Sequence, residues 1–261
     1  MISALASTEP KVVFVTGASA GFGAAVARTF AKRGAKVIAA ARREERLAEL
    51  ARELSPESVL ALPLDVTVRE DVLAAVANLP PAFRDVDLLV NSAGLALGLA
   101  GAQAAKLDDW DTMIATNCAG LATVTRALLP GMVERKRGHV VNLGSVAGSY
   151  PYPGGNVYGA TKAFVHQFSL NLRSDLHGTG VRVTCIEPGM CGGTEFSEVR
   201  FLGDKAKAAA VYAGMTPLSA EDVAEAVAWA ASQPPHVNVN VIELMPVAQS
   251  FSPFQVDRQK T

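Results

Sequence analysis

A tyrosine and a lysine four positions apart have the clearest potential for proton transfer in this chain. Tyr158 and Lys162 lie in a segment of helical pattern, which places both side chains on one helix face. A phenol ordinarily titrates near pH ~10, but an ammonium about 4 Å away stabilises the phenolate by roughly 4 kcal/mol. The pair could therefore act as an acid and base near neutral pH. Ser145, at the end of an earlier apolar run, could hold the oxygen whose proton moves.

The same spacing also fits a tyrosine and a lysine that are exposed to solvent on one helix face. The surrounding elements are needed to distinguish this from an acid/base pair. Short apolar runs alternate with helix-length segments along almost the whole chain. Uninterrupted apolar runs indicate strands buried on both faces, and helical crossovers indicate parallel pairing. We therefore predict a single α/β domain, a doubly wound Rossmann fold with a seven-stranded, mainly parallel sheet and helices on both faces. The predicted strands span residues 11–16, 36–41, 59–64, 87–91, 138–143, 181–186 and 237–244.

The helical pattern predicts helices over residues 24–33, 44–54, 108–135 and 156–175. One long segment, residues 192–217, lies outside this alternation. Ligands of doubly wound sheets bind beyond the carboxyl ends of the strands, so an insertion after a late strand is expected to form a lid over the site. An ordinary surface loop is the alternative, although loops of this length in compact domains are usually functional or disordered.

A glycine-rich turn between the first predicted strand and helix indicates a dinucleotide site. Three glycines form a wider-spaced relative of the usual fingerprint, and a strand and a helix flank them as that fingerprint requires. The first glycine allows a sharp turn, and the other two let the backbone approach a pyrophosphate at the start of the helix. The expected contacts in this turn are Gly17, Ser19, Gly21, Phe22 and Gly23.

The end of the second predicted strand favours NADP over NAD. An NAD site usually has an acidic residue there that bonds the ribose 2′-hydroxyl, whereas this chain has Arg42 and Arg43. Guanidinium groups match a phosphate in geometry and charge, so we expect both arginines to bind the 2′-phosphate. Arginines that only solvate a helix start are less favoured, because the first turn of a helix disfavours cations. Asp65 and Val66 are expected at the adenine, and Asn91 at a ribose.

The composition excludes several other classes of protein. Of 261 residues, 49% are hydrophobic and 19% are charged, and the formal net charge is −1. A chain with this charge and no basic run is not expected to bind nucleic acid or an anionic membrane surface. Neither a signal peptide nor an apolar window of ~18 residues is evident, so a cytoplasmic location is expected. The three cysteines lack CxxC spacing, and neither a disulfide framework nor a metal site is expected.

These motifs together resemble the classical short-chain dehydrogenase/reductase family, over nearly the whole chain. The resemblance rests on the glycine turn, the Asn91-x-Ala-Gly stretch, Ser145 and the Tyr158-x-x-x-Lys162 pair. In that family the tyrosine is the acid/base, the lysine lowers its pKa and binds the nicotinamide ribose, and the serine orients the substrate oxygen. An asparagine after the fourth strand completes a proton relay through water, and here that role falls on Asn117.

The resemblance also reaches the nicotinamide end and the substrate. Pro188 and Gly189 match the family's stretch beside the nicotinamide, and Thr194 is a candidate donor to its amide or to a phosphate. Several blocks resemble the NADP-dependent 3-hydroxy acid dehydrogenases, which act on serine, allo-threonine and the 3-hydroxypropionate/malonic semialdehyde pair. These blocks are residues 93–98, 154–158, 175–179, 192–196, 199–201 and 245–246.

This likeness implies reversible hydride transfer between NADP and the hydroxyl carbon of a short 3-hydroxy acid. Tyr158 would take the hydroxyl proton, and Asn117 would link Lys162 to solvent. The substrate carboxylate must also be held, and Arg200 in the predicted lid is the candidate because guanidinium and carboxylate pair bidentately. A solvent-facing lid arginine is an equally good explanation of Arg200.

Two other functions remain open at this stage. A broad NADPH ketoreductase for β-keto esters or other carbonyls would use the same chemistry on another substrate. A non-catalytic NADP(H)-sensing binding protein could share the fold, since fold does not determine function, although the intact catalytic set disfavours it. The resemblance further implies a homotetramer, built on the Ala- and Leu-rich segments 108–135 and 156–175.

Three residues depart from the family pattern, and two histidines resemble general bases but are not expected to act as such. Ser92 stands where an asparagine is usual, and Met190 and Cys191 replace an aliphatic pair, which puts the substrate range in doubt. We expect the latter two side chains to pack rather than react. His166 and His177 lie at positions that the family does not use, so surface or packing roles are expected for both.

Overall fold

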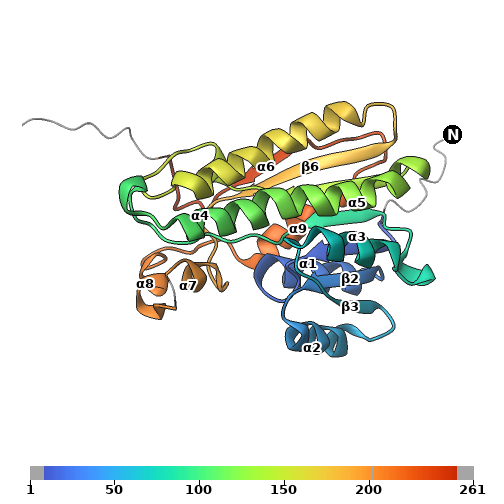
Figure 1. Ribbon diagram of the computed structural model, residues 1–261, viewed down its shortest axis with the longest axis horizontal. Helices are drawn as coiled ribbons and strands as arrows, with labels where there is room; N and C mark the ends of the chain where they lie inside the picture. Colours follow the sequence, from blue (N-terminus) through green and yellow to red (C-terminus); the bar gives the residue numbers. More distant parts are fainter. Residues whose placement is uncertain (1–8, 202, 252–261) are drawn as a thin grey trace, which may run out of the picture.

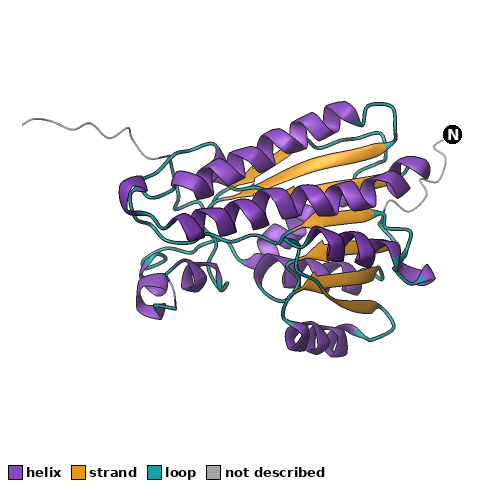
Figure 2. Cartoon of the chain, viewed as in Figure 1, coloured by secondary structure: helices purple, strands orange, loops and turns teal. Residues whose placement is uncertain are grey.

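Parallel strands form the centre of the molecule in the computed structural model, which describes residues 9–201 and 203–251. Within these ranges a seven-stranded sheet runs in the order β3-β2-β1-β4-β5-β6-β7, and every neighbouring pair is parallel (Figures 1 and 2). The predicted α/β doubly wound fold is confirmed. The strands are β1 Val12–Thr16, β2 Lys36–Ala41, β3 Val59–Pro63, β4 Leu88–Asn91, β5 Gly138–Leu143, β6 Val181–Pro188 and β7 Val241–Leu244.

Helices cover both faces of the sheet because each strand is apolar on both sides. Val13 and Val15 of β1 pack in one core cluster with α1, α2 and α9, while Val12 and Phe14 pack in another with α3, α5 and α6. The first three helices span Gly21–Lys32, Glu44–Leu54 and Ala220–Ser232, and the second three span Arg69–Ala77, Leu121–Glu134 and Asn156–Asp175.

The predicted strand over residues 237–244 is shorter in the structure, since only Val241–Leu244 forms the β7 ladder. The residues before it are attached to β6 by side chains instead. Asn238 accepts a hydrogen bond from the Val183 amide at 2.8 Å, and the Val239 carbonyl accepts one from the Thr184 hydroxyl at 2.7 Å. These bonds hold the segment beside β6 without the regular backbone pattern of a strand.

The predicted helix over residues 108–135 forms as one unbroken run of helical residues, but it includes a wider turn. It consists of α4 Leu107–Ile114, a π-helical turn Ala115–Gly120 and α5. Such wide turns occur mostly as single insertions in α-helices, often at functional sites. Periodicity does not predict this turn. Its last residue, Gly120, lies against Val66, where a Cβ would come within 2.8 Å of a Val66 methyl group.

The predicted lid, residues 192–217, is a loop whose two ends are joined. Cys191 and Leu218 form an isolated parallel bridge, and Leu218 exchanges hydrogen bonds with Gly192 and Met190 at 2.9 and 3.0 Å. Between these ends lie the short helices α7 Phe196–Arg200 and α8 Lys205–Ala210, which extend beyond the sheet in Figure 1. The segment therefore has structure of its own.

The chain reverses its direction of winding between β1 and β4, which are neighbours although β2 and β3 come between them in sequence. In a doubly wound sheet this switch point opens a crevice at the carboxyl ends of the strands. The glycine turn follows β1 directly, and α1 begins at Gly21 rather than at residue 24, so two of the three glycines belong to its first turn.

We predict that Gly23→Ala destabilises the fold and weakens coenzyme binding. A Cβ at Gly23 would overlap the Gly17 carbonyl oxygen and lie 2.7 Å from its carbon, and both are backbone atoms that cannot rotate away. Overpacking of this kind costs about 1–3 kcal/mol, which urea unfolding would measure. Gly131→Ala in α5 is the control, because its new methyl group would meet only the movable end of Arg135. Equal unfolding midpoints for the two variants would contradict this account of the turn.

Candidate active site

Two adjoining cavities open at the carboxyl edge of the sheet. The smaller, about 340 Å³, lies over the glycine turn, and the larger, about 1050 Å³, lies over the ends of β5 and β6. Both are lined by residues from the turns after β1 and β4 and from the lid. The shared residues are Phe22, Ser92, Gly94, Leu95, Thr194 and Phe196. One long ligand can therefore span both cavities.

The structure brings most of the predicted site residues to these cavities. The smaller cavity is lined by Gly17, Ser19, Gly21, Phe22, Arg42, Arg43, Asp65, Val66 and Thr194. The larger one is lined by Ser145, Tyr158, Lys162, Pro188, Gly189, Thr194 and Arg200. Three predicted residues, Gly23, Asn91 and Asn117, line neither cavity and lie behind them.

Asn91 supports the site from within the sheet. Its side-chain amide donates hydrogen bonds to the Thr125 hydroxyl at 2.9 Å and to the side-chain oxygen of Asn142 at 2.8 Å. Its side chain is buried between β4, β5 and α5, which leaves the backbone of this turn as the part that could approach a ribose. The residues that follow it, Ser92 to Gly94, line the cavity in its place.

Thr16, the last residue of β1, holds the β4 turn against the glycine turn. Its hydroxyl accepts hydrogen bonds from the backbone amides of Ser92 and Ala93, both at 3.0 Å. A Cβ at Gly17 would lie 2.9 Å from the Ala93 backbone, so only glycine allows the two turns to meet. Because the contact uses backbone amides, a serine at position 92 leaves it intact.

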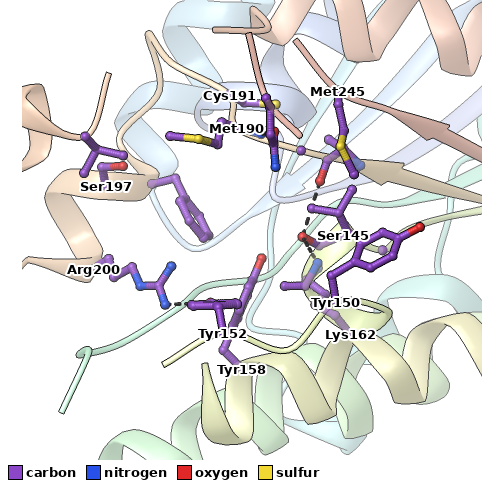
Figure 3. Close-up of a pocket in the computed structure, with 18 of the residues that line it drawn as sticks. Ser145, Tyr150, Tyr152, Tyr158, Lys162, Met190, Cys191, Ser197, Arg200 and Met245 are labelled. Carbon is purple, nitrogen blue, oxygen red and sulfur yellow. Dashed lines mark hydrogen bonds between the residues drawn. The ribbon is translucent and has the colours of Figure 1, made fainter. Parts of the chain in front are cut away.

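Tyr158 is buried at the floor of the larger cavity, and Figure 3 shows its hydroxyl and Ser145 facing the same space. Burial raises the pKa of the phenol above its ordinary value of 10.0, and hydrogen bonding with Ser145 and the charge of Arg200 oppose this rise. Ser145 is held by two bonds of its own: its hydroxyl donates to the Pro188 carbonyl at 3.3 Å and accepts from the Ala147 amide at 3.1 Å. The phenol is therefore a proton donor in this structure.

Lys162 does not lower the phenol pKa as the spacing suggested. Its ammonium donates to the Leu143 carbonyl at 2.8 Å and lies 5.9 Å from the centre of the Tyr158 ring. Burial lowers the pKa of Lys162 from 10.5 to about 8. We expected the attraction between the two groups to exceed their loss of solvation, but their shared burial disfavours the charged form of each.

Asn117 is placed by the π-helical turn. Its carbonyl oxygen accepts from the Leu95 amide at 2.9 Å, and its amide donates to the Leu95 carbonyl at 2.9 Å and to the Thr161 hydroxyl at 3.1 Å. A Cβ at Gly94 would lie 3.3 Å from the Asn117 oxygen and 3.6 Å from the Lys162 ammonium. Gly94 therefore keeps the space between these two groups free of side-chain atoms.

The two arginines after β2 differ in their contacts. Arg43 donates to the Ser19 hydroxyl at 3.1 Å and pairs with Glu195 of the lid at 2.7 Å. Arg42 lies 3.9 Å from Asp65 and is more exposed. Both side chains line the smaller cavity, so two guanidinium groups are available there for an anionic ligand.

Arg200 lines the larger cavity, whereas the alternative explanation was an arginine that faces the solvent. One of its terminal nitrogens donates to the Tyr152 hydroxyl at 2.7 Å (Figure 3), and its guanidinium carbon lies 5.6 Å from the centre of the Tyr158 ring. Its Nε donates to the Gly98 carbonyl at 3.4 Å. The lid thus places a cation next to the buried phenol.

Two residues of the site were missing from the sequence interpretation. Tyr152 holds Arg200, and the Gln249 oxygen accepts from the Met190 amide at 2.7 Å, which fixes the turn after β6. The position of Tyr152 between two prolines, shortly before Tyr158, could have indicated its role. No local pattern marks Gln249, because it reaches the turn only through the fold.

The remaining candidates have packing roles, as expected. His166 pairs with Glu187 at 2.6 Å, which joins α6 to β6. Burial raises the pKa of Cys191 to about 12, which keeps the thiol protonated. Among the described residues no group of three or more His, Cys, Asp or Glu could hold a metal ion. No helix in the same ranges is long and apolar enough to cross a membrane.

A buried proton donor beside a two-part cavity at the switch point of a parallel sheet is the arrangement of a dinucleotide-dependent oxidoreductase. The sequence model of the short chain dehydrogenase family matches residues 11–204. The chain belongs to this family.

Similar proteins narrow the comparison further. NADP-dependent 3-hydroxy acid dehydrogenase of Salmonella typhi is 60% identical, over 95% of this chain and 99% of its own. Serine 3-dehydrogenase of Rhizobium radiobacter is 55% identical, over 95% of this chain and 98% of its own. A solved structure, the closed form of serine dehydrogenase complexed with NADP+, has 57% identity and a TM-score of 0.94, and the match covers 95% of this chain and all of that one.

We predict that the stability difference between the wild type and Lys162→Met changes with pH. The pKa of Lys162 is about 8 in the folded protein against an ordinary 10.5. Above pH ~8 the unfolded chain therefore binds more protons at this lysine than the folded one, and wild-type stability gains with rising pH. Urea unfolding of both proteins between pH ~7 and ~9.5 would show the wild type gaining relative to the methionine variant. A constant difference would mean that Lys162 is charged throughout this range.

Proposed function

We propose that this protein is an NADP-dependent oxidoreductase that transfers a hydride between NADP(H) and the hydroxyl or carbonyl carbon of a short 3-hydroxy acid. The substrates are of the serine, allo-threonine and 3-hydroxypropionate/malonic semialdehyde class. The observation that carries this proposal is the guanidinium of Arg200 next to the phenol of Tyr158, inside one cavity. The similarity to 3-hydroxy acid and serine dehydrogenases supports it.

The residues of the smaller cavity fit NADP. Gly17 and Gly23 leave no room for a side chain, which suits a backbone approach to a pyrophosphate. Arg42 and Arg43 offer two guanidinium groups for the 2′-phosphate, with Ser19 beside the second. Asp65 and Val66 line the end where the adenine would bind, and Thr194 lies between the two cavities.

The nicotinamide of bound NADP supplies the hydride acceptor or donor. The side chains of this protein carry out the proton transfer. Tyr158, held neutral by burial, donates its proton to the substrate oxygen in reduction and takes it back in oxidation, while Ser145 hydrogen-bonds that oxygen. Lys162, whose side chain lines the same cavity as Tyr158, is the candidate to hold a ribose of the coenzyme. Asn117 orders the proton path behind Lys162, through its bonds to Leu95 and Thr161.

Arg200 is the proposed clamp for the carboxylate. A 3-hydroxy acid places its carboxylate two bonds beyond the reacting carbon, and Arg200 and Tyr158 are close enough to hold the two ends of such a molecule. Among the residues that the structure describes, the guanidinium donates its hydrogen bonds to two neutral oxygens, the Gly98 carbonyl and the Tyr152 hydroxyl. A carboxylate would give it a charged partner, and charge-assisted hydrogen bonds are roughly twice as strong as neutral ones.

Tyr158→Phe should bind NADPH as tightly as the wild type and lose almost all turnover. The change removes one hydroxyl and leaves the ring that packs beside Phe196, with ring centres 5.8 Å apart. Loss of a general acid typically lowers the rate about 10²–10⁴-fold. NADPH fluorescence titration and steady-state assays would measure the two effects separately. Full activity in this variant would exclude the proton-transfer role.

Arg200→Ala should raise the KM for 3-hydroxypropionate or serine about 10- to 100-fold, because a charged hydrogen bond contributes about 1.5–3 kcal/mol. Methyl esters of the same acids lack the charge and should show little change. The control is Arg126→Ala, which removes an exposed arginine of α5 outside both cavities. Equal losses for acids and esters would rule out a carboxylate clamp.

A broad ketoreductase for β-keto esters or other carbonyls is the second candidate. The larger cavity has apolar walls that a small hydroxy acid does not need, formed by Leu99, Val146, Pro151, Met245 and Phe251. Esters that turn over as well as free acids in the wild type would favour it. A non-catalytic NADP(H) sensor is less favoured, because Ser145, Tyr158 and Lys162 lie together in one cavity.

We also propose a cytoplasmic homotetramer. Leu107 and Ile114 of α4 are 69% and 47% exposed, and Phe164 of α6 is 40% exposed. Large apolar side chains on adjacent helices support a subunit contact there. Cys118, Cys185 and Cys191 are all free thiols, in keeping with a reducing compartment.

A further inference from the structure

One carboxylate of the lid lies in the smaller cavity, against the arginines of the second βα unit. Glu195 pairs with Arg43 at 2.7 Å, and its other oxygen lies 3.8 Å from Arg46, one turn further along the chain. Glu195 and Arg43 both line this cavity. The lid thus places a negative charge on the same guanidinium group that the 2′-phosphate of NADP would use.

A carboxylate and a phosphate cannot share these arginines without cost. Two unit charges 4 Å apart at an effective dielectric near 20 repel each other by about 4 kcal/mol, and less where solvent reaches them. Arg43 donates one hydrogen bond from Nε to the Ser19 hydroxyl and one from a terminal nitrogen to the Glu195 carboxylate. Binding of a 2′-phosphate therefore competes directly with the lid.

The competition favours the phosphate. The side chains of Glu195 and Arg43 are 41% and 46% exposed, and ion pairs at such positions contribute only about 0.2–1 kcal/mol. A phosphate carries a charge of about −1.5 to −2 and three strong acceptor oxygens. The coenzyme can thus displace the carboxylate, but its affinity is reduced by the cost of doing so.

We propose that Glu195 is a specificity-determining residue that competes with the 2′-phosphate for Arg43 and leaves Arg43 and Arg46 when NADP binds. The inference rests on the proposed use of NADP. A coenzyme with a plain 2′-hydroxyl has no charge with which to displace Glu195. The carboxylate therefore weakens phosphate binding while leaving the binding of NAD unaffected.

The position of Glu195 links this exchange to the substrate cavity. Glu195 is the residue immediately before α7, which carries Phe196 beside Tyr158 and ends at Arg200. Release of the carboxylate removes an ion pair that ties the start of this helix to α2. The phosphate end of the coenzyme thereby acts on the helix that holds the proposed carboxylate clamp.

Glu195→Gln tests the competition by binding rather than by turnover. At low ionic strength the variant should bind NADPH about 1.5- to fivefold more tightly than the wild type, with NADH unchanged. Adenosine 2′,5′-bisphosphate, which has the 2′-phosphate but no nicotinamide, should follow NADPH. Isothermal titration calorimetry gives all three dissociation constants, and the gain should shrink in high salt.

Glu198→Gln is the matched control, because it makes the same change in α7 at a residue that lines neither cavity. Its dissociation constants should equal those of the wild type. Unchanged or weaker NADPH binding in Glu195→Gln would overturn the inference. Failure of the wild type to bind NADPH at all would instead overturn the proposed coenzyme, so the two failures are distinct.

Hydrogen exchange tests the link to the lid. Adenosine 2′,5′-bisphosphate should increase the exchange of amides in α7 of the wild type, since it frees Glu195 without reaching the larger cavity. The same ligand should leave α7 unaffected in Glu195→Gln, where no ion pair is lost. Equal responses in both proteins would show that Glu195 does not connect the coenzyme to the lid.

Discussion

Parallel pairing of the strands is the constraint on which the rest of the structure depends. All strands of the described sheet run in one direction, so every carboxyl end lies at the same edge. Residues from distant parts of the sequence therefore meet there, from Gly17 after β1 to Ser145 after β5 and Gly189 after β6. Helices pack on both faces of the sheet and leave this edge as the place where a long ligand can bind.

Burial governs the chemistry at that edge. The phenol of Tyr158 and the ammonium of Lys162 both lose solvent, which raises the pKa of the first and lowers that of the second. Each group is thereby moved toward its neutral form, and Ser145 and Arg200 partly oppose this effect at the phenol. A charged ligand next to two buried groups changes this balance more than it would at an exposed surface, because charges interact more strongly where the effective dielectric is low.

The fold and much of the site could be predicted from the sequence because both follow from local patterns. Apolar runs and helical spacing identified the strands, and the flanked glycines identified the turn after β1. Contacts across the fold could not be predicted from such patterns. Regular helical spacing does not reveal the π-helical turn around Asn117, and it does not show that the Asn91 side chain turns into the sheet toward Thr125 and Asn142.

By itself the sequence determined the sheet, the coenzyme turn and the pairing of Tyr158 with Lys162 on one helix face, because near neighbours in the chain set these features. Only the tertiary structure decided the direction of the pKa shifts, since desolvation depends on how many other segments cover a group. It also decided what the lid contacts. Glu195 meets Arg43 and Arg200 meets Tyr152 because residues Cys191 and Leu218 join the ends of the lid and bring both charges over the cavities.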